Sequence, residues 1–185
     1  MEKRTIGVLV GSLRAGSFCK IIASHLAGLL TEQFDVKFLD ISDLSMYNQD
    51  LDAENVTPQA WLDFRQEVKA LDAVLFVTPE YNRSLPPVLI NALDIASRPY
   101  GKNAWDGKPG AVVSVSPGAM GGYGANHILR QSAAFLNIYM MQQPEAYIGN
   151  VAASTDETGV RDESLKKFLQ SIAGAFTDWV NKFTA

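Results

Sequence analysis

Val8–Phe18 reads VLVGSLRAGSF, a short apolar run that ends at a glycine and continues into a loop with an arginine between two serines. An apolar run of this length indicates a buried strand. The hydroxyl groups, the arginine and the main-chain amides freed by glycine suit an anion with several oxygen atoms. The stretch therefore predicts a strand, an anion-binding loop and the start of a helix.

The alternation of strand and helix continues along the chain. The apolar run AVLFV at Ala73–Val77 is typical of a central parallel strand that is buried on both faces. Further strands are predicted at residues 5–11, 36–40, 110–116 and 138–142, and helices at residues 18–30, 61–71, 86–97, 122–136 and 162–183. This order, without a sequence repeat, predicts an α/β fold: a doubly wound five-stranded parallel sheet with helices on both faces. We expect residues 1–185 to form a single domain.

The composition of the chain argues against several kinds of binding partner. The formal net charge is −4, from 16 basic and 20 acidic residues without a long basic run, which argues against a nucleic-acid groove or a membrane-binding patch. The N-terminal apolar run is too short for a signal peptide or a membrane span. Cys19 is the single cysteine and fits a reducing cytoplasm, and two histidines are too few for a zinc-type cluster. We therefore expect a small-molecule partner and no metal.

Three chemically unusual loops follow the predicted strands, at Ser12–Ser17, Thr78–Ser84 and Ser116–Gly124. In a doubly wound sheet the ligand binds at the carboxyl ends of the strands, where the direction of winding changes. The three loops should therefore meet at one edge of the sheet and form one site.

The first loop is compared with known phosphate-binding loops. Its glycines have the spacing of a Walker A loop, but Ser17 and Phe18 stand where that loop needs lysine and a hydroxyl residue. A dinucleotide-binding loop would recruit Asp40 for the ribose, but the glycines do not follow its pattern. A low-molecular-weight tyrosine phosphatase needs a cysteine at the head of the loop, and Cys19 lies after it. A terminal phosphate monoester fits Ser12, Arg14 and Ser17 best; the simpler alternative is an ordinary turn with Ser17 as the helix N-cap.

The other two loops suit a flat ring. In TPEYNRSLPP, at 78–87, Pro79 and Pro86 stiffen the loop so that Tyr81 and Asn82 are held in place. The alternative is a plain turn with Asn82 in a left-handed conformation. In SPGAMGGYG, at 116–124, four glycines allow the main chain to approach a ring edge. Together the loops predict a phosphate at one end of the site and a flat heteroaromatic ring at the other.

GSLRAGS at 11–17, TPEYN at 78–82 and SPGAMGG at 116–122 resemble the NAD(P)H-dependent FMN reductase family, which includes bacterial quinone, azo and chromate reductases. The segment SRPYGKNAWDGKP at 97–109 also resembles it, so the likeness covers nearly the whole chain. It implies a flavodoxin-like FMN-binding domain. The site residues that it implies are Ser12, Arg14, Ser17, Phe18 and Cys19 around the FMN phosphate, Pro79, Glu80, Tyr81 and Asn82 along the isoalloxazine, and Ser116, Gly118, Met120, Gly121 and Gly122 at its polar edge.

The resemblance also implies a reaction. NADPH or NADH delivers a hydride to FMN and leaves, and a quinone-like, azo or other small-molecule acceptor then takes two electrons by a ping-pong mechanism. No side chain is expected to be catalytic, because the cofactor carries the chemistry. A homodimer or homotetramer is implied as well. The alternatives are a flavin reductase that supplies reduced FMN to a monooxygenase and a flavodoxin-like one-electron carrier.

Four narrower expectations concern individual residues. Met46 and Tyr47 should wall the acceptor pocket or, alternatively, seal the core. His127 lies more than one turn into its predicted helix, so we expect it not to act as a catalytic acid. Gly121→Val should lower FMN affinity and leave the fold of the apoprotein intact, if this turn faces the ring. Pro86–Pro87 and Ile90 depart from the family pattern. The preference of family members for NADH or NADPH is therefore a weaker guide to the preference of this chain.

Overall fold

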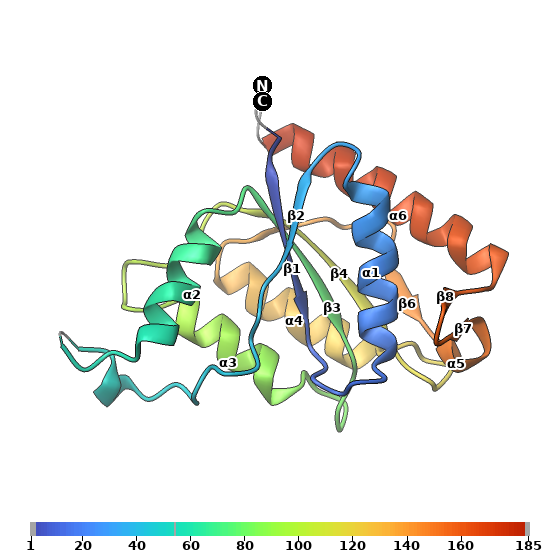
Figure 1. Ribbon diagram of the computed structural model, residues 1–185. Helices are drawn as coiled ribbons and strands as arrows, with labels where there is room; N and C mark the ends of the chain where they lie inside the picture. Colours follow the sequence, from blue (N-terminus) through green and yellow to red (C-terminus); the bar gives the residue numbers. More distant parts are fainter. Residues whose placement is uncertain (1–2, 54, 184–185) are drawn as a thin grey trace.

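The computed structural model describes residues 3–53 and 55–183, in which strands and helices alternate in the predicted order (Figure 1). The strands are β1 (Thr5–Val10), β2 (Asp35–Phe38), β3 (Ala73–Thr78), β4 (Pro109–Val115), β5 (Tyr139–Met140), β6 (Ala146–Ile148), β7 (Thr155–Asp156) and β8 (Gly159–Val160). The helices are α1 (Phe18–Leu30), the 3-10 turn η1 (Gln49–Leu51), α2 (Gln59–Lys69), α3 (Pro87–Ala96), α4 (Tyr123–Phe135), α5 (Val151–Ser154) and α6 (Glu163–Phe183). Every predicted helix and strand is therefore present.

The central sheet has the strand order β2-β1-β3-β4-β5, and all its pairings are parallel. β5 pairs with the start of β4 at Pro109 and Gly110, whereas β6 pairs with its end at Val113–Val115. Two short segments therefore share the fifth position beside β4. The doubly wound sheet with five strand positions is confirmed, with its last position divided.

Besides the 3-10 turn η1, four short elements were not predicted: β6, α5 and the antiparallel pair β7–β8. Each has between two and four residues. Such segments are too short to show the apolar periodicity on which sequence prediction depends. They all lie between residues 146 and 160, which the sequence left without an assignment.

Helices cover both faces of the sheet. α1 and α6 lie together on one face, and α2, α3 and α4 lie on the other (Figure 1). Along β3, Leu75 and Val77 pack under the first layer, while Val74 and Phe76 pack under the second. Successive side chains of a strand point to opposite faces, so a strand covered on both faces needs apolar residues throughout. This explains why the apolar run at 73–77 is continuous.

The carboxyl ends of β1, β3, β4 and β6 lie at one edge of the sheet, the lower edge in Figure 1. The main-chain amide of Gly11 donates to the carbonyl of Val77 over 2.9 Å, which joins the loop after β1 to the end of β3. The amide of Ser116 donates to the carbonyl of Ile148 over 2.9 Å. The three unusual loops are therefore neighbours at this edge, as predicted.

Candidate functional site

The first loop meets the second loop at Gly11. A Cβ atom at Gly11 would lie 2.9 Å from Cγ of Pro86 and 3.1 Å from Cδ of Pro79, so a side chain would not fit. Ser12 and Ser17, on either side of the exposed loop tip, are both buried. The two ends of the loop are thus buried. Glycine is needed at position 11 because Pro79 and Pro86 leave no room for a side chain, which could not be inferred from the sequence.

Ser17 occupies the N-cap position of α1. Its side chain makes no capping hydrogen bond to a described residue, although its carbonyl accepts from the amides of Lys20 and Ile21. No acidic residue stands in the first turn of α1. The positive end of the helix dipole is therefore not neutralised by an acidic side chain and can serve a bound anion, while the buried Ser17 hydroxyl lies beside the Cys19 thiol. This favours the anion-binding interpretation over the ordinary N-cap.

Arg14 and Cys19 differ in what they offer to an anion. The exposed Arg14 side chain lies over the ring of Phe18, with the guanidinium carbon 5.4 Å from the ring centroid, so its charge stands above the first turn of α1. The Cys19 side chain is 2% exposed and packs in the core between the sheet, α1 and α6. Burial raises the pKa of its thiol to about 12, although Ser17 and Arg14 act in the opposite direction. Cys19 therefore offers its main-chain amide rather than a thiolate.

The second loop ends in a tight hairpin turn. Tyr81 and Ser84 exchange two main-chain hydrogen bonds of 3.0 and 2.9 Å. Asn82 and Arg83 between them have φ angles of 51° and 63°, so both are left-handed. Two left-handed central residues are typical of a type I′ turn. The left-handed Asn82 of the plain-turn alternative is thus present, while the Tyr81 side chain remains half exposed.

Glu80 joins the second loop to the third. One carboxylate oxygen accepts a hydrogen bond from the main-chain amide of Ala125, in the first turn of α4, over 3.0 Å. The other oxygen accepts from Nη1 of Arg83 over 2.9 Å. A Cβ at Gly124 would lie 2.9 Å from the first of these oxygens, so glycine is needed there. Because Ala125 and Arg83 hold the carboxylate of Glu80, we expect this side chain to position the two loops. A contact of Glu80 with a flavin ring would then come from its main chain.

We expect Glu80→Ala to separate the two loops. Loss of a helix-capping carboxylate costs about 0.5–2 kcal/mol of stability, and we expect FMN affinity to fall roughly tenfold, equivalent to about 1.4 kcal/mol. Glu80→Gln should lie between wild type and Glu80→Ala, since an amide oxygen still accepts from Ala125. Thermal unfolding and fluorescence titration with FMN measure the two effects.

Glu163→Ala is the matched control, because Glu163 forms an exposed ion pair with Lys166 at the same spacing, on α6. Exposed ion pairs contribute little to stability. If Glu80→Ala behaves like Glu163→Ala in both measurements, Glu80 does not position the loops.

The third loop divides into an exposed and a packed part. The amide of Gly118 donates to Oγ of Ser116 over 3.0 Å, and a Cβ at Gly118 would meet only that hydroxyl, at 3.5 Å. Gly121 and Gly122 are buried and left-handed, with φ angles of 60° and 76°. A Cβ at Gly121 would lie 2.6 Å from the carbonyl carbon of Tyr147, and one at Gly122 would lie 3.0 Å from Cβ of Ser114. These two glycines let the turn pack on β4 and β6.

The expectation that Gly121→Val spares the fold is therefore wrong. The expectation assumed that the main chain at every glycine of the turn lies against a flavin ring, with space for a side chain in the apoprotein. The main chain of Tyr147 occupies the space beside Gly121 instead. Pro117, Gly118, Ala119 and Met120 are exposed and Ser116 is half-buried, so this part of the loop remains open to a ligand.

The segment after β2 has two parts. Tyr47 packs on Trp61, with ring centroids 5.3 Å apart, and its amide donates to Oδ1 of Asn91 over 2.7 Å. Tyr47 thus seals the core beside α2 and α3. Met46 is 69% exposed and remains available at the surface. Of the pair predicted to wall an acceptor pocket, only Met46 has an exposed side chain.

His127 lies in the second turn of α4 and its side chain is exposed. Its Nε2 atom is 2.9 Å from the hydroxyl of Tyr147, and its ring lies 4.2 Å from that of Tyr123. These contacts give His127 a place in an exposed aromatic cluster, and its lack of a catalytic role stays a prediction. Among residues 3–53 and 55–183, no three His, Cys, Asp or Glu side chains form a candidate metal site, and no helix is long and apolar enough to cross a membrane.

Known proteins agree with this arrangement. The sequence profile of NADPH-dependent FMN reductases matches residues 4–153. The chain belongs to this family. It is 51% identical to a quinone reductase of Pseudomonas putida, over 95% of this chain and 94% of that protein. It is 44% identical to a 2-hydroxy-1,4-benzoquinone reductase of a Burkholderia species, over 95% of each chain.

Solved structures show the same fold. The Paracoccus denitrificans flavoenzyme FerB, an NAD(P)H:(acceptor) oxidoreductase, superimposes with a TM-score of 0.90 at 41% identity, over 97% of this chain and 98% of that one. A flavodoxin of Pseudomonas aeruginosa superimposes with a TM-score of 0.62 at 20% identity, over 94% of this chain and 99% of that one. The second likeness concerns the fold alone, which is flavodoxin-like.

This FMN reductase uses FMN, with NADPH or NADH as the hydride donor. The residues present fit the cofactor's phosphate. The Ser17 hydroxyl makes no capping hydrogen bond among the described residues, the first turn of α1 carries no acid, and Arg14 stands above that turn. This is the donor set that a terminal phosphate requires.

Proposed function

We propose that this enzyme reduces quinones, or acceptors of similar shape such as azo compounds, by two electrons in a ping-pong reaction. The observation that carries the proposal is the donor set at the start of α1, which would fix the phosphate end of FMN beside the two loops that suit its ring. The relatives named quinone reductase and 2-hydroxy-1,4-benzoquinone reductase support a quinone as the acceptor.

In this proposal each loop has its own task. Ser12, Arg14 and Ser17 hold the phosphate, together with the amides of Phe18 and Cys19. The main chain of Pro79, Glu80 and Asn82 and the side chain of Tyr81 lie along the ring, and Ser116, Gly118 and Met120 lie at its polar edge. Gly121 and Gly122 shape the third loop from beneath.

Bound FMN supplies hydride acceptance and the two-electron delivery. The chain supplies position and electrostatics. The Arg14 guanidinium and the α1 dipole neutralise the phosphate, and main-chain amides of the second and third loops stabilise negative charge at the ring edge. Glu80 holds those two loops at a constant separation through Ala125.

Steady-state kinetics test the reaction sequence. If donor and acceptor use one face of the site in turn, double-reciprocal plots at several quinone concentrations should be parallel. Intersecting lines would show a ternary complex instead. Negligible NAD(P)H oxidation with every acceptor would favour a one-electron carrier, and reduction of free FMN without quinone reduction would favour a flavin reductase that serves a monooxygenase.

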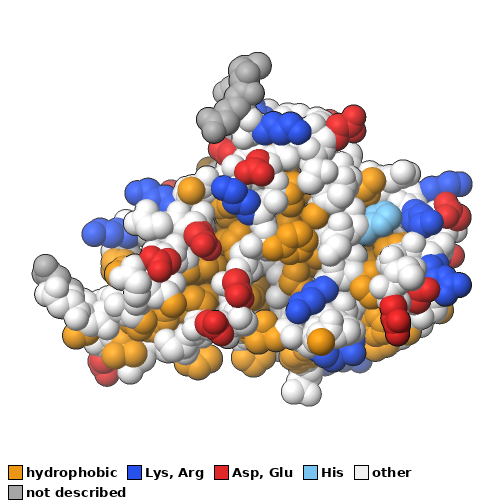
Figure 2. Space-filling view, viewed as in Figure 1, with side chains coloured by type: hydrophobic (Ala, Val, Ile, Leu, Met, Phe, Trp, Pro, Cys, Tyr) orange, Lys and Arg blue, Asp and Glu red, His pale blue; other side chains and the backbone are white. Residues whose placement is uncertain are grey.

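We further propose that the enzyme is a homodimer or homotetramer whose partner subunit covers the site. Apolar side chains are exposed around the loops, among them Met46 at 69%, Met120 at 56%, Tyr123 at 47% and Tyr81 at 45%. Figure 2 shows apolar side chains along the lower edge of the molecule, where these loops lie. Light scattering should give a dimer or tetramer at assay concentrations; a fully active monomer would contradict the proposal.

Two broader assignments stay proposals. We propose that residues 1–185 form one flavodoxin-like FMN-binding domain, since both helical layers pack on a single sheet. We also propose a cytoplasmic location, because the single cysteine, Cys19, is free and buried. Fractionation of the source cells tests the second assignment, and limited proteolysis, which should give no stable fragment, tests the first.

A further inference from the structure

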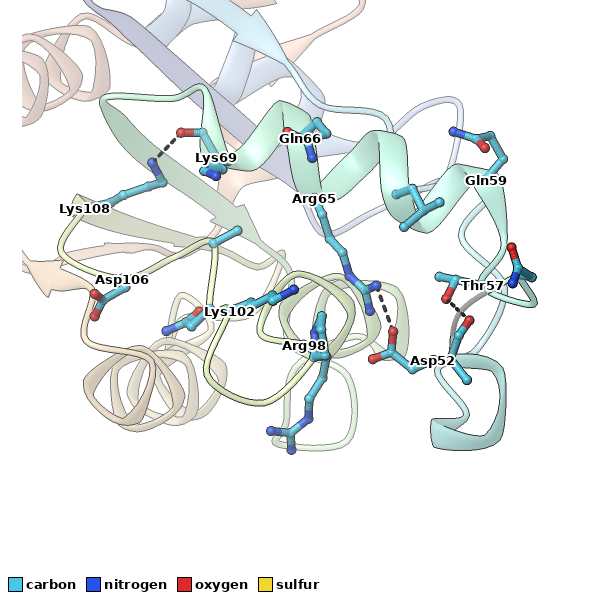
Figure 3. A pocket seen from close by; sticks show the side chains of 16 residues that line it. Asp52, Thr57, Gln59, Arg65, Gln66, Lys69, Arg98, Lys102, Asp106 and Lys108 are labelled. Carbon is cyan, nitrogen blue, oxygen red and sulfur yellow. Dashed lines mark hydrogen bonds and ion pairs between the residues drawn. The ribbon is translucent and has the colours of Figure 1, made fainter.

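A second hollow lies away from the flavin loops. It is a groove of about 1040 Å³ between α2 and the segment 98–108 that precedes β4 (Figure 3). One wall is a stripe along α2 that includes Gln59, Leu62, Arg65 and Lys69. None of its lining residues belongs to the three loops at the carboxyl edge of the sheet. Its volume is that of a small-molecule binding site.

The groove is strongly cationic in a protein that is acidic overall. Among the described residues, five of the chain's 16 basic residues line it, against two of its 20 acidic residues. They are Arg65, Lys69, Arg98, Lys102 and Lys108 against Asp52 and Asp106. The described lining residues therefore carry a formal charge of +3, whereas the chain has −4. Such a concentration of one sign attracts an anion.

Four of these cations form no ion pair within residues 3–53 and 55–183: Lys69, Arg98, Lys102 and Lys108. The charge of Arg98 acts on Asp94. Lys108 is already engaged, because its ammonium group donates to the carbonyls of Lys69 and Leu71. Figure 3 shows Lys69 on the α2 wall and Lys102 on the facing segment. An anion between the walls would meet positive charge from both sides.

Arg65 adds an unsatisfied donor within the wall. Its side chain is 10% exposed; Nε donates to the carbonyl of Ile95 over 2.8 Å, and Nη1 donates to Oδ1 of Asp52 over 2.9 Å. Nη2 is buried and has no hydrogen-bond partner among the described residues. A buried donor without a partner is costly, and a guanidinium prefers the oxygens of phosphate and carboxylate. Asp52 neutralises only one of the groove's cations.

Near the start of α2 the described lining is mostly uncharged. It includes Asn55, Thr57 and Gln59, beside the Asp52 that is paired with Arg65, and the half-exposed Leu62 stands between these residues and the lysines. A ligand that fits the whole groove therefore has an anionic group at one end and an uncharged part, with hydrogen-bonding groups and an apolar surface, at the other.

We propose that the groove binds a nucleoside diphosphate. The diphosphate lies between Lys69 and Lys102, within reach of the Arg65 wall, and the nucleoside lies toward Leu62, Thr57 and Gln59. The nucleotide is separate from the nicotinamide donor, because the cationic end of the groove lies beside the starts of β3 and β4, whereas the flavin loops follow the ends of these strands.

The test is direct binding of ADP to the FMN-loaded enzyme, measured by calorimetry at low salt. Saturation with FMN keeps ADP out of the phosphate loop. The double variant Lys69→Gln/Lys102→Gln should bind ADP at least about tenfold more weakly than wild type, because two charge-assisted contacts are lost. Lys167→Gln removes a charge from the exposed side of α6, on the opposite face, and should bind ADP as wild type does.

Kinetics separate this site from that of the nicotinamide donor. ADP should bind without competing with NADPH, and the double variant should keep the wild-type KM for NADPH. Competition with NADPH together with a raised KM in the double variant would overturn the proposal. No ADP binding at millimolar concentration, or equal binding by all three proteins, would overturn the proposal. Because the calorimetric readout needs no turnover, this failure is distinct from a failure of the proposed reductase reaction.

Discussion

Arg14→Ala is expected to weaken FMN binding by about 10- to 100-fold and to leave riboflavin binding nearly unchanged. The size of the loss follows from one charge-assisted hydrogen bond of about 1.5–3 kcal/mol. Riboflavin lacks the phosphate, so it does not use the guanidinium that stands over Phe18 at the start of α1. Fluorescence titration of the apoprotein with each flavin measures both affinities.

Lys20→Ala is the matched control for Arg14→Ala. Lys20 is an exposed cation in the first turn of the same helix, and its charge acts on Asp40. We expect it to change FMN affinity by less than about threefold, since a charge that makes no direct contact is screened by water and salt. Equal losses for FMN and riboflavin in Arg14→Ala would remove Arg14 from the phosphate site.

Gly121→Val should destabilise the apoprotein by roughly 2–6 kcal/mol, which combines left-handed strain with overpacking. The φ angle of Gly121 is 60°, and its Cβ would lie 2.6 Å from the carbonyl carbon of Tyr147. Net stabilities are usually about 5–15 kcal/mol, so this variant should melt far earlier or fail to fold. Thermal unfolding measures the change.

Gly118→Val separates folding from flavin contact in the same loop. A Cβ at Gly118 would meet only the Ser116 hydroxyl, so the apoprotein should melt near the wild-type temperature. If the loop faces the ring, FMN affinity should fall about tenfold, equivalent to about 1.4 kcal/mol. An unchanged FMN titration would place residues 116–122 away from the cofactor, and a wild-type melting curve for Gly121→Val would contradict the packing described.

Local pattern was sufficient for the fold. The uninterrupted apolar run at Ala73–Val77 indicated a strand covered on both faces, and Phe76 and Leu75 do pack under different helical layers. The positions of the three loops could be predicted from the strands, because parallel strands end at one edge of the sheet. The division of the fifth position between β5 and β6 could not be predicted, since two or three residues are too few to show an alternation of apolar and polar side chains.

Side-chain partners were beyond the reach of the sequence wherever they are distant along the chain. Glu80 was assigned to the ring because it stands in the second motif, but its partner is the amide of Ala125, 45 residues later. The place of Gly121 at the ring edge stays a prediction, but the sequence could not show that a Cβ there would meet Tyr147 on β6, an element that was not predicted. The cationic groove was missed for the same reason, because its lysines come from α2 and from the segment 98–108.

The burial of Cys19 has a consequence for an enzyme that handles quinones. Quinones are electrophiles, and they become covalently attached to proteins through cysteine thiolates. A thiol that is 2% exposed and has a pKa near 12 supplies almost no thiolate at neutral pH, and the reagent cannot reach it. The single sulfhydryl group of this chain is therefore protected from arylation by the very compounds proposed as its substrates.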